Sequence, residues 1–119
     1  MIAEGMLLVR GGPDNGSTVA LSQGMTVIGR VAPSDIILDQ VVVSRRHAGI
    51  RGGSDGYWIA DLGSRNGTFV NGERVEEEPR RLRDLDRIEL GGTDIPVHWI
   101  FRESQATTGV PKPKPTPKS

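Results

Sequence analysis

The sequence predicts an all-β fold in which two antiparallel sheets pack as a sandwich. Short apolar runs alternate with turn-forming residues roughly every eight to twelve residues. Sixteen glycines and eight prolines among the 119 residues indicate many tight connections, and the chain has only two tryptophans, one tyrosine and two phenylalanines. No window shows the sustained three- and four-residue apolar spacing of an amphipathic helix. The sequence therefore favours short strands throughout.

Ten segments are predicted to be strands, because each joins β-branched or other apolar residues between turn signals. In chain order they are residues 6–10, 17–21, 25–30, 35–38, 48–51, 57–61, 68–70, 73–74, 87–90 and 95–102. The connections include Asn66-Gly67 and Asn71-Gly72, dipeptides that accept positive φ and form tight turns. The charged stretch at residues 76–81 (EEEPRR) is expected to be a solvated, charge-paired loop. The last segment alternates most regularly and has one apolar face, formed by Ile95, Val97, Trp99 and Phe101.

Residues 1–102 are expected to fold as one domain, and residues 103–119 to form a disordered C-terminal tail or a linker to further sequence. The tail is rich in proline and contains all of the chain's lysines, Lys112, Lys114 and Lys118. Its threonines, Thr107, Thr108 and Thr116, are candidate phosphorylation sites that the same molecule or a neighbour could recognise. An inert linker is the simpler interpretation.

Composition excludes several classes of function. The chain has no cysteine, which rules out disulfides, thiol catalysis and cysteine-based zinc sites and favours a reducing compartment. Fifteen basic residues balance fifteen acidic ones, so no overall field attracts nucleic acid or a membrane. The apolar run at residues 6–9 is far too short for a signal peptide or a membrane span. We therefore expect a cytoplasmic protein without nucleic-acid or membrane partners.

Four polar clusters fall at strand ends or in loops: Gly29-Arg30, residues 44–47 (SRRH), residues 64–68 (SRNGT) and Asn71-Gly72. Loops at one end of a sandwich converge, so groups that are distant in sequence can build one site. The clusters offer guanidinium, hydroxyl and amide groups, and none of them contains an acidic residue. Such a set suits a compact anion with several acceptor oxygens, and a phosphate monoester is the obvious candidate.

The order and spacing of these clusters closely resemble the forkhead-associated (FHA) domain. The stretch IADLGSRNGTFVNG, residues 59–72, is especially similar, as is LRDLDRIELGG, residues 82–92. The resemblance covers about residues 6–101. It implies a β-sandwich of eleven strands whose loops bind phosphothreonine peptides, with no catalytic activity. We expect no cofactor and no bound metal, since the two histidines stand apart in the sequence.

The resemblance implies that Arg30 and Ser44 bind the phosphate, that Arg45 and Arg65 join them, and that Asn66 holds the peptide backbone beside the phosphothreonine. Arg65 departs from the family, in which this position is often threonine. Its guanidinium either adds a charged donor to the phosphate or faces an acidic residue of the ligand. The residues expected to support the loops are Gly29, His47, Gly67, Thr68 and Asn71.

Two pairs of neighbouring residues suggest other interpretations. Arg45 and Arg46 follow each other directly, so in an extended chain they point to opposite sides, and at most one faces the phosphate. Ser44 and His47 could suggest a hydrolase, but no nucleophile elbow surrounds Ser44. The adjacent arginines would also oppose formation of an imidazolium.

The expected function is a monomeric, phosphothreonine-dependent protein–protein interaction module in signalling. Its expected partner is a phosphothreonine-containing protein, such as a substrate of a serine/threonine kinase. The alternative is a phosphate-independent scaffold or oligomerisation domain of the same fold. The joint presence of Arg30, Ser44 and Asn66 argues against that alternative, because such a scaffold needs none of them.

Overall fold

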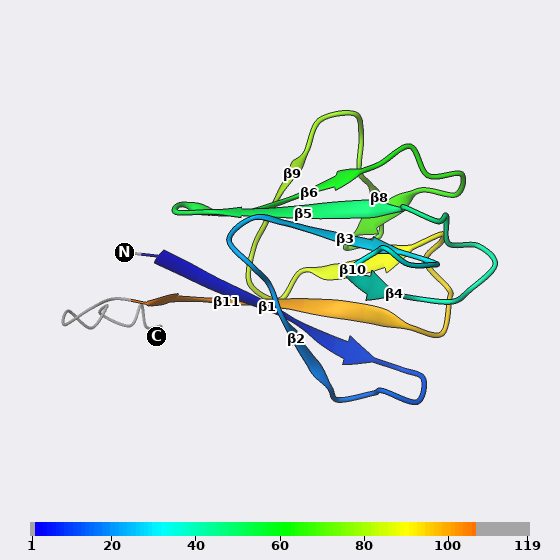
Figure 1. Ribbon diagram of the computed structural model, residues 1–119, viewed down its shortest axis with the longest axis horizontal. Coiled ribbons are helices and arrows are strands. Elements are labelled where there is room, and N and C mark those ends of the chain that lie inside the picture. Colours follow the sequence, from blue (N-terminus) through cyan, green and yellow to red (C-terminus); the bar gives the residue numbers. More distant parts are fainter. Residues whose placement is uncertain (1, 107–119) are drawn as a thin grey trace.

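The computed structural model describes residues 2–106, which form eleven strands and contain no helix (Figure 1). In chain order the strands are β1 (Ile2–Arg10), β2 (Thr18–Ala20), β3 (Met25–Gly29), β4 (Ile36–Ile37), β5 (Ala48–Gly53), β6 (Gly56–Asp61), β7 (Thr68–Val70), β8 (Glu73–Arg74), β9 (Arg80–Leu82), β10 (Arg87–Leu90) and β11 (His98–Ala106). Within this part of the chain, no helix is long and apolar enough to cross a membrane. Residues 107–119, which include most of the expected tail and its three threonines, lie outside the described residues.

The strands form two sheets that pack as a sandwich (Figure 1). The six-stranded sheet has the order β2-β1-β11-β10-β7-β8, and the five-stranded sheet has the order β4-β3-β5-β6-β9. Neighbouring strands are antiparallel, except that β3 and β4 pair in parallel, with Ile28 opposite Ile36. The predicted all-β sandwich of about eleven strands is therefore confirmed, with this one parallel pair as an addition.

The hydrophobic core lies between the two sheets. The alternation predicted for the last strand is present, because Val97, Trp99 and Phe101 are all buried, although β11 itself begins at His98. From the opposite sheet, the fully buried ring of Tyr57 meets Phe101 edge-on, with ring centroids 5.6 Å apart. This is a favourable arrangement for two aromatic quadrupoles. The Tyr57 hydroxyl accepts a hydrogen bond from the Gly5 amide at 3.0 Å, which satisfies a polar group within the core.

Strand β9 is not among the predicted strands. The prediction of a solvated loop at residues 76–81 is wrong for Arg80 and Arg81, which lie in this strand. Leu82 is fully buried, and the guanidinium of Arg81 lies over the Trp58 ring at 5.1 Å from its centroid. Arg80 forms an ion pair with Glu73 at 2.8 Å rather than with the acidic run beside it. Because β9 is an edge strand, one apolar residue anchors it while the arginine stems cover its neighbours. A strand with a single apolar residue gives no hydrophobic alternation from which it could be predicted.

Strands β1 and β11 extend further than their apolar residues indicate. Ile2 pairs with Ala106, so residues 103–106, which were expected in the tail, form the end of β11. A β ladder is held by main-chain hydrogen bonds, which polar residues can form as well as apolar ones.

The start of β1 and the end of β11 lie at the opposite end of the sandwich from the polar loops. Figure 1 shows the first and last strands leaving one end, and the β3–β4, β4–β5 and β6–β7 connections gathered at the other. The β3–β4 connection begins at Arg30, the β4–β5 connection carries residues 44–47, and the β6–β7 connection carries residues 62–67. The fold therefore brings the three main polar clusters of the sequence to one end of the molecule.

Candidate functional site

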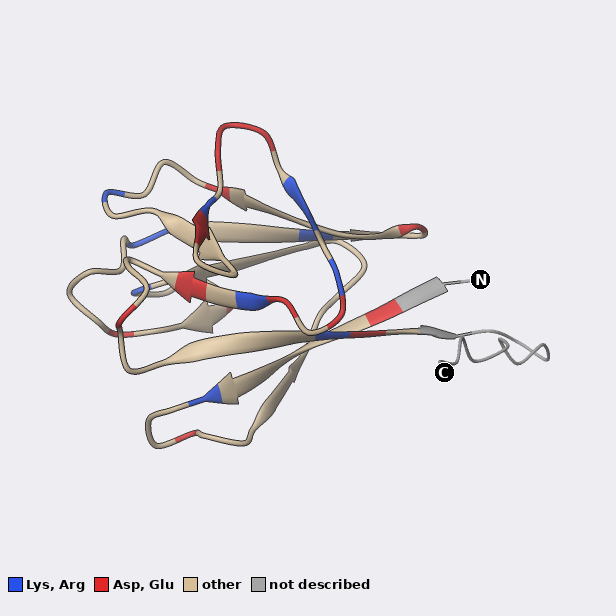
Figure 2. Ribbon diagram, turned by 180° about the vertical axis from the view of Figure 1, so that it is seen from behind, with Lys and Arg blue, Asp and Glu red and all other residues tan. Residues whose placement is uncertain are grey.

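The loops at this end enclose a pocket of about 460 Å³. Four arginines contribute to its lining and no carboxylate does; the lining residues are Arg30, Val41, Val42, Val43, Ser44, Arg45, Arg46, Arg65 and Asn66. Figure 2 shows basic segments in the loops at the end opposite the start of β1 and the end of β11. The pocket is therefore a concentration of positive charge on a chain that has no net charge.

Arg30 and Ser44 are brought together by main-chain hydrogen bonds. The Arg30 amide donates to the Ser44 carbonyl oxygen at 3.0 Å and to the Arg45 carbonyl oxygen at 3.1 Å. The Arg30 side chain is partly buried, and its Nε atom is buried with no hydrogen-bond partner among the described residues. A buried donor without an acceptor is costly, so this guanidinium is suited to a ligand that supplies an acceptor oxygen.

Gly29 permits the close approach of these two segments. A Cβ atom at this position would overlap the Arg45 carbonyl oxygen and lie 2.5 Å from Ser34 Oγ. Ser34 Oγ itself donates to the Arg45 carbonyl oxygen at 3.1 Å. The end of β3 and the loop that carries Ser44 can therefore touch only because residue 29 has no side chain.

The hydroxyl of Ser44 is oriented by the neighbouring loop. Its Oγ atom accepts a hydrogen bond from the Arg65 backbone amide at 3.0 Å. A serine hydroxyl has one proton to donate and two lone pairs to accept with. Because the Arg65 amide donates to one of these lone pairs, the Ser44 proton stays available for a ligand oxygen.

His47 fixes the same loop from inside the protein. The ring is fully buried. Its Nδ1 accepts a hydrogen bond from the Ser44 amide at 3.0 Å, and its Nε2 donates to the Gly67 carbonyl oxygen at 2.7 Å. Burial lowers the pKa of His47, although the Gly67 hydrogen bond and the charge of Asp61 act to raise it. The imidazole is therefore a neutral brace bonded to the Ser44 backbone rather than a base for its hydroxyl, which argues against a hydrolase.

Asp61 is a structural centre of the site that sequence reasoning missed. Its Oδ1 accepts from Ser64 Oγ and Thr68 Oγ1, both at 2.6 Å, and its Oδ2 accepts from the amides of Ser64 at 2.9 Å and Gly63 at 3.1 Å. Burial raises the pKa of Asp61, but the hydrogen bonds from Ser64 and Thr68 lower it, and the pKa lies below its usual value overall. An aspartate at a strand end, two residues before glycine and three before serine, is the pattern of an Asx turn, and that signal could have identified it.

The β6–β7 loop is held on several sides. Ser64 Oγ accepts from the Gly67 amide at 2.9 Å, and Asn66 Nδ2 donates to the Val42 carbonyl oxygen at 3.0 Å. Gly67 has a φ of 94°, in the region that favours glycine. Thr68, which is buried, anchors the start of β7 on Asp61. Gly67 and Thr68 thus make the contacts that a loop-supporting role requires.

Asn71 supports a different turn. It has a φ of 54° in the β7–β8 hairpin. Its Nδ2 donates to Asp86 Oδ1 at 2.8 Å, and its Oδ1 accepts from the Arg87 amide at 2.9 Å. Asn71 therefore braces the entry to β10 and does not line the arginine pocket.

Arg45 and Arg46 both line the pocket. That at most one of them faces a bound phosphate stays a prediction. That expectation assumed an extended chain, but the backbone bends at these two residues and β5 begins only at Ala48. In a bend, successive side chains can project toward the same side.

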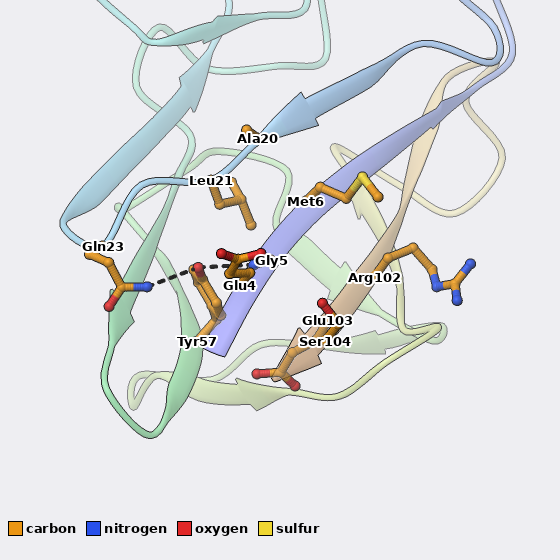
Figure 3. Close-up of a pocket in the computed structure, with 10 residues that line it drawn as sticks. All are labelled: Glu4, Gly5, Met6, Ala20, Leu21, Gln23, Tyr57, Arg102, Glu103 and Ser104. Carbon is orange, nitrogen blue, oxygen red and sulfur yellow. Dashed lines mark hydrogen bonds between the residues drawn. The ribbon is translucent and has the colours of Figure 1, made fainter. Parts of the chain in front are cut away.

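A second and larger pocket, of about 640 Å³, lies beside the first residues of β1 and the later residues of β11. Figure 3 shows its lining between β1, β11 and the chain that follows β2. Two carboxylates, Glu4 and Glu103, contribute to it, and its one guanidinium, that of Arg102, already pairs with Asp84 at 3.0 Å. Burial raises the pKa of Glu103, and the charge of Arg81 only partly offsets this rise. The charge of Asp84 also raises the pKa. An anion would meet acidic groups here, so the smaller, arginine-lined pocket is the candidate site.

No group of three or more potential ligands within residues 2–106 is arranged to hold a metal ion. The lining of the arginine pocket offers hydrogen-bond donors and positive charge.

Comparison with known proteins agrees with the resemblance in the sequence. A family model described as the FHA domain matches residues 26–91. The chain is 45% identical over 86 residues to an oxoglutarate dehydrogenase inhibitor of Corynebacterium jeikeium, covering 72% of this chain and 58% of that protein. It is 43% identical over 86 residues to the glycogen accumulation regulator GarA of Mycobacterium tuberculosis, covering 72% of this chain and 52% of that protein. The matched region is thus little more than half the length of these relatives.

The fold has solved counterparts. A structure from a structural and functional analysis of phosphothreonine-dependent FHA domain interactions has a TM-score of 0.72 and 35% sequence identity. The alignment covers 83% of this chain and 95% of that chain.

Proposed function

The chain belongs to the FHA-domain family, and we propose on that basis that it binds phosphothreonine-containing proteins through the pocket formed by Arg30, Ser44 and Arg45. The relatives are named as a regulator and an inhibitor, which supports a regulatory interaction module rather than an enzyme. The proposed ligand is a short extended segment of a partner protein that a serine/threonine kinase has phosphorylated. The proposed site of action is the cytoplasm, and the proposed binding unit is a monomer.

The observation that carries the proposal is a pair of donors without acceptors in one pocket. Arg30 Nε is buried and has no partner within residues 2–106. The Ser44 hydroxyl lines the same pocket. Its proton is available to a ligand, because the hydrogen bond from the Arg65 amide uses only a lone pair of the oxygen. A phosphothreonine brings about −1.5 to −2 charges and three strong acceptor oxygens. It is the modification that such a donor set complements.

The exposed guanidinium of Arg45 lines the same pocket and supplies a further charged donor. Hydrogen bonds to charged groups contribute about 1.5–3 kcal/mol each. Two or three of them, less the ordering of an extended peptide, correspond to dissociation constants around the micromolar range. That affinity suits a reversible reader of a kinase signal.

Asn66 is the proposed contact for the ligand backbone. Its Nδ2 donates to the Val42 carbonyl oxygen, so the amide bridges the two loops on either side of the pocket. This bond fixes the carboxamide and leaves Oδ1 as the group that would accept a peptide N–H.

A library of peptides that carry phosphothreonine, phosphoserine or unmodified threonine tests the proposal. The expected result is binding that depends on phosphate and is strongest for phosphothreonine. Equal binding of phosphorylated and unmodified peptides would instead support a phosphate-independent scaffold. Arg51→Gln is the matched control for site variants, because Arg51 is exposed on β5 and does not line the pocket.

A further inference from the structure

The arginine pocket has more positive charge than one phosphothreonine can neutralise. Four guanidiniums line it, whereas the modified residue brings about −1.5 to −2 charges. The ion pairs found in residues 2–106 use Arg80, Arg87 and Arg102 instead, with Glu73, Glu89 and Asp84 as their partners. The four pocket arginines thus form no salt bridge within the described part of the chain. A ligand with only a phosphate would leave about two positive charges unmatched.

The backbone around Arg65 is fixed, while its side chain is exposed. The Arg65 amide donates to Ser44 Oγ at 3.0 Å, one residue after Ser64, whose amide and hydroxyl are bound to Asp61. On the other side, Asn66 is bound to the Val42 carbonyl oxygen. The Cα of Arg65 is therefore held beside the Ser44 hydroxyl, and its guanidinium extends from a rigid base.

The carboxylate beneath the Arg65 loop, that of Asp61, is already used by hydrogen bonds of the loop itself. Asp61 supports this loop, but both of its oxygens already accept hydrogen bonds, from Ser64, Thr68 and Gly63. The pocket lining itself contains no acidic residue. Arg65 forms no salt bridge within the described residues, so its guanidinium is available to a carboxylate of the ligand.

Arg30 and Arg65 differ in depth. Arg30 is partly buried with a buried Nε, and its amide is bonded to the loop of Ser44. It is therefore the inner cation, placed for the phosphate. Arg65 is an exposed cation at the rim, next in sequence to the residue that would hold the ligand backbone. A rim position beside the ligand's main chain favours contact with a neighbouring side chain of the ligand.

We propose that Arg65 is a specificity-determining residue that selects phosphothreonine partners with an aspartate or glutamate close to the phosphothreonine. The planar guanidinium suits a carboxylate, which it can bind through two parallel hydrogen bonds. This inference rests on the proposed phosphothreonine binding and adds the chemical class of the flanking residue. An exposed pair of this kind contributes up to about 1 kcal/mol, which corresponds to about a fivefold change in affinity.

A paired peptide scan tests this inference by fluorescence anisotropy with the full chain. One phosphothreonine peptide has only uncharged flanking residues. The others carry a single aspartate at each flanking position in turn, or asparagine of nearly the same shape at that position. At one or more positions, the wild-type chain is expected to bind the aspartate peptide about fivefold more tightly than the asparagine peptide.

Arg65→Gln is expected to reduce this preference to less than twofold, measured as the ratio of the two affinities within the same variant. Arg65→Glu is expected to reverse the preference, favouring lysine over aspartate at the same position. Arg46→Gln is the matched control, since Arg46 is an exposed arginine of the same pocket. It should keep the preference.

Three results would overturn the role of Arg65 without touching the proposed function. The first is an unchanged aspartate preference in Arg65→Gln. The second is an equal loss of that preference in Arg65→Gln and Arg46→Gln, which would indicate an effect of the total positive charge of the pocket. The third is equal binding of aspartate and asparagine peptides by the wild type. In all three cases phosphate dependence of the uncharged peptide would leave the proposed function intact. If that peptide bound equally well without its phosphate, both proposals would fall.

Discussion

The Nδ1 atom of His47 accepts a hydrogen bond from the Ser44 amide at 3.0 Å, while its Nε2 lies 2.7 Å from the Gly67 carbonyl oxygen. The buried imidazole thus joins the loop that carries Ser44 to the loop that carries Arg65 and Asn66. An amide N–H can only donate, so Nδ1 must be unprotonated and the ring must be neutral. The geometry of the candidate site therefore depends on the protonation state of one residue.

We expect His47→Asn to lower the free energy of unfolding by about 1–3 kcal/mol and to weaken phosphopeptide binding. The shorter side chain can replace Nδ1 as an acceptor but cannot also reach the Gly67 carbonyl oxygen. Urea unfolding and peptide titration measure the two effects. His98→Asn is the control, because His98 lies on β11 outside the pocket. Equal losses in both variants would contradict a specific bracing role for His47.

Stability is expected to fall as the pH is lowered from neutral, because burial lowers the pKa of His47 below its usual 6.5. In the pH range between the two pKa values the unfolded chain binds the proton and the folded chain does not, so the free energy of unfolding rises with pH. The contribution is complete above about pH 6.5 and is lost as the pH falls toward the lowered pKa.

Urea unfolding at a series of pH values between neutral and mildly acidic checks this dependence. Burial and the charge of Arg87 also lower the pKa of His98, which acts in the same direction. The comparison therefore needs both histidine variants. His98→Asn should retain part of the pH dependence and His47→Asn should reduce it; a slope unaffected by His47→Asn would rule out His47 as a source.

We expect Asp61→Asn to weaken peptide binding even though Asp61 does not line the pocket. The amide keeps one acceptor oxygen, so the Ser64 and Gly63 amides lose the Oδ2 that they share. A loss of about 2 kcal/mol of stability corresponds to two weakened hydrogen bonds. Asp39→Asn, at an exposed residue outside the arginine pocket, should leave unfolding and binding near wild type. Wild-type values for both measurements in Asp61→Asn would show that the loop does not depend on this carboxylate.

Gly29→Ala is expected to destabilise the fold by about 1–3 kcal/mol, the usual range for overpacking. The new Cβ would overlap the Arg45 carbonyl oxygen and force β3 away from the loop that carries Ser44. Gly24→Ala is a matched control, because nothing lies within 4 Å of a Cβ built there. Thermal or urea unfolding compares the two variants. Similar stability in both would mean that the contact at Gly29 relaxes without cost.

The turn chemistry of the sequence predicts much of the sheet structure. β7, β8 and β10 have the bounds predicted for them, because Asn-Gly and Gly-Gly pairs mark their ends. The convergence of Arg30 and Ser44 on one pocket also follows from the sequence, since strand-end loops of a sandwich meet at one end. These features depend on local backbone preferences, which single residues reveal.

The remaining features depend on contacts that only the folded chain makes. β9 has one buried apolar residue, Leu82, and its arginines pack through their stems and through the Trp58 ring. The role of Asp61 comes from four donors that converge after the loop closes. Arg46 joins the pocket because the chain bends there, which the two adjacent arginines do not indicate by themselves.

The most direct test is a titration of the full chain with one phosphothreonine peptide, chosen from the library, and with its unphosphorylated form. The wild type should bind only the phosphorylated peptide with affinity around the micromolar range. Arg30→Ala should lose about 2–5 kcal/mol of binding free energy and keep its stability, because the backbone amide that holds the loop is retained. Arg51→Ala should bind as the wild type does. Equal affinity for both peptides, or unchanged affinity in Arg30→Ala, would contradict phosphate recognition at this pocket.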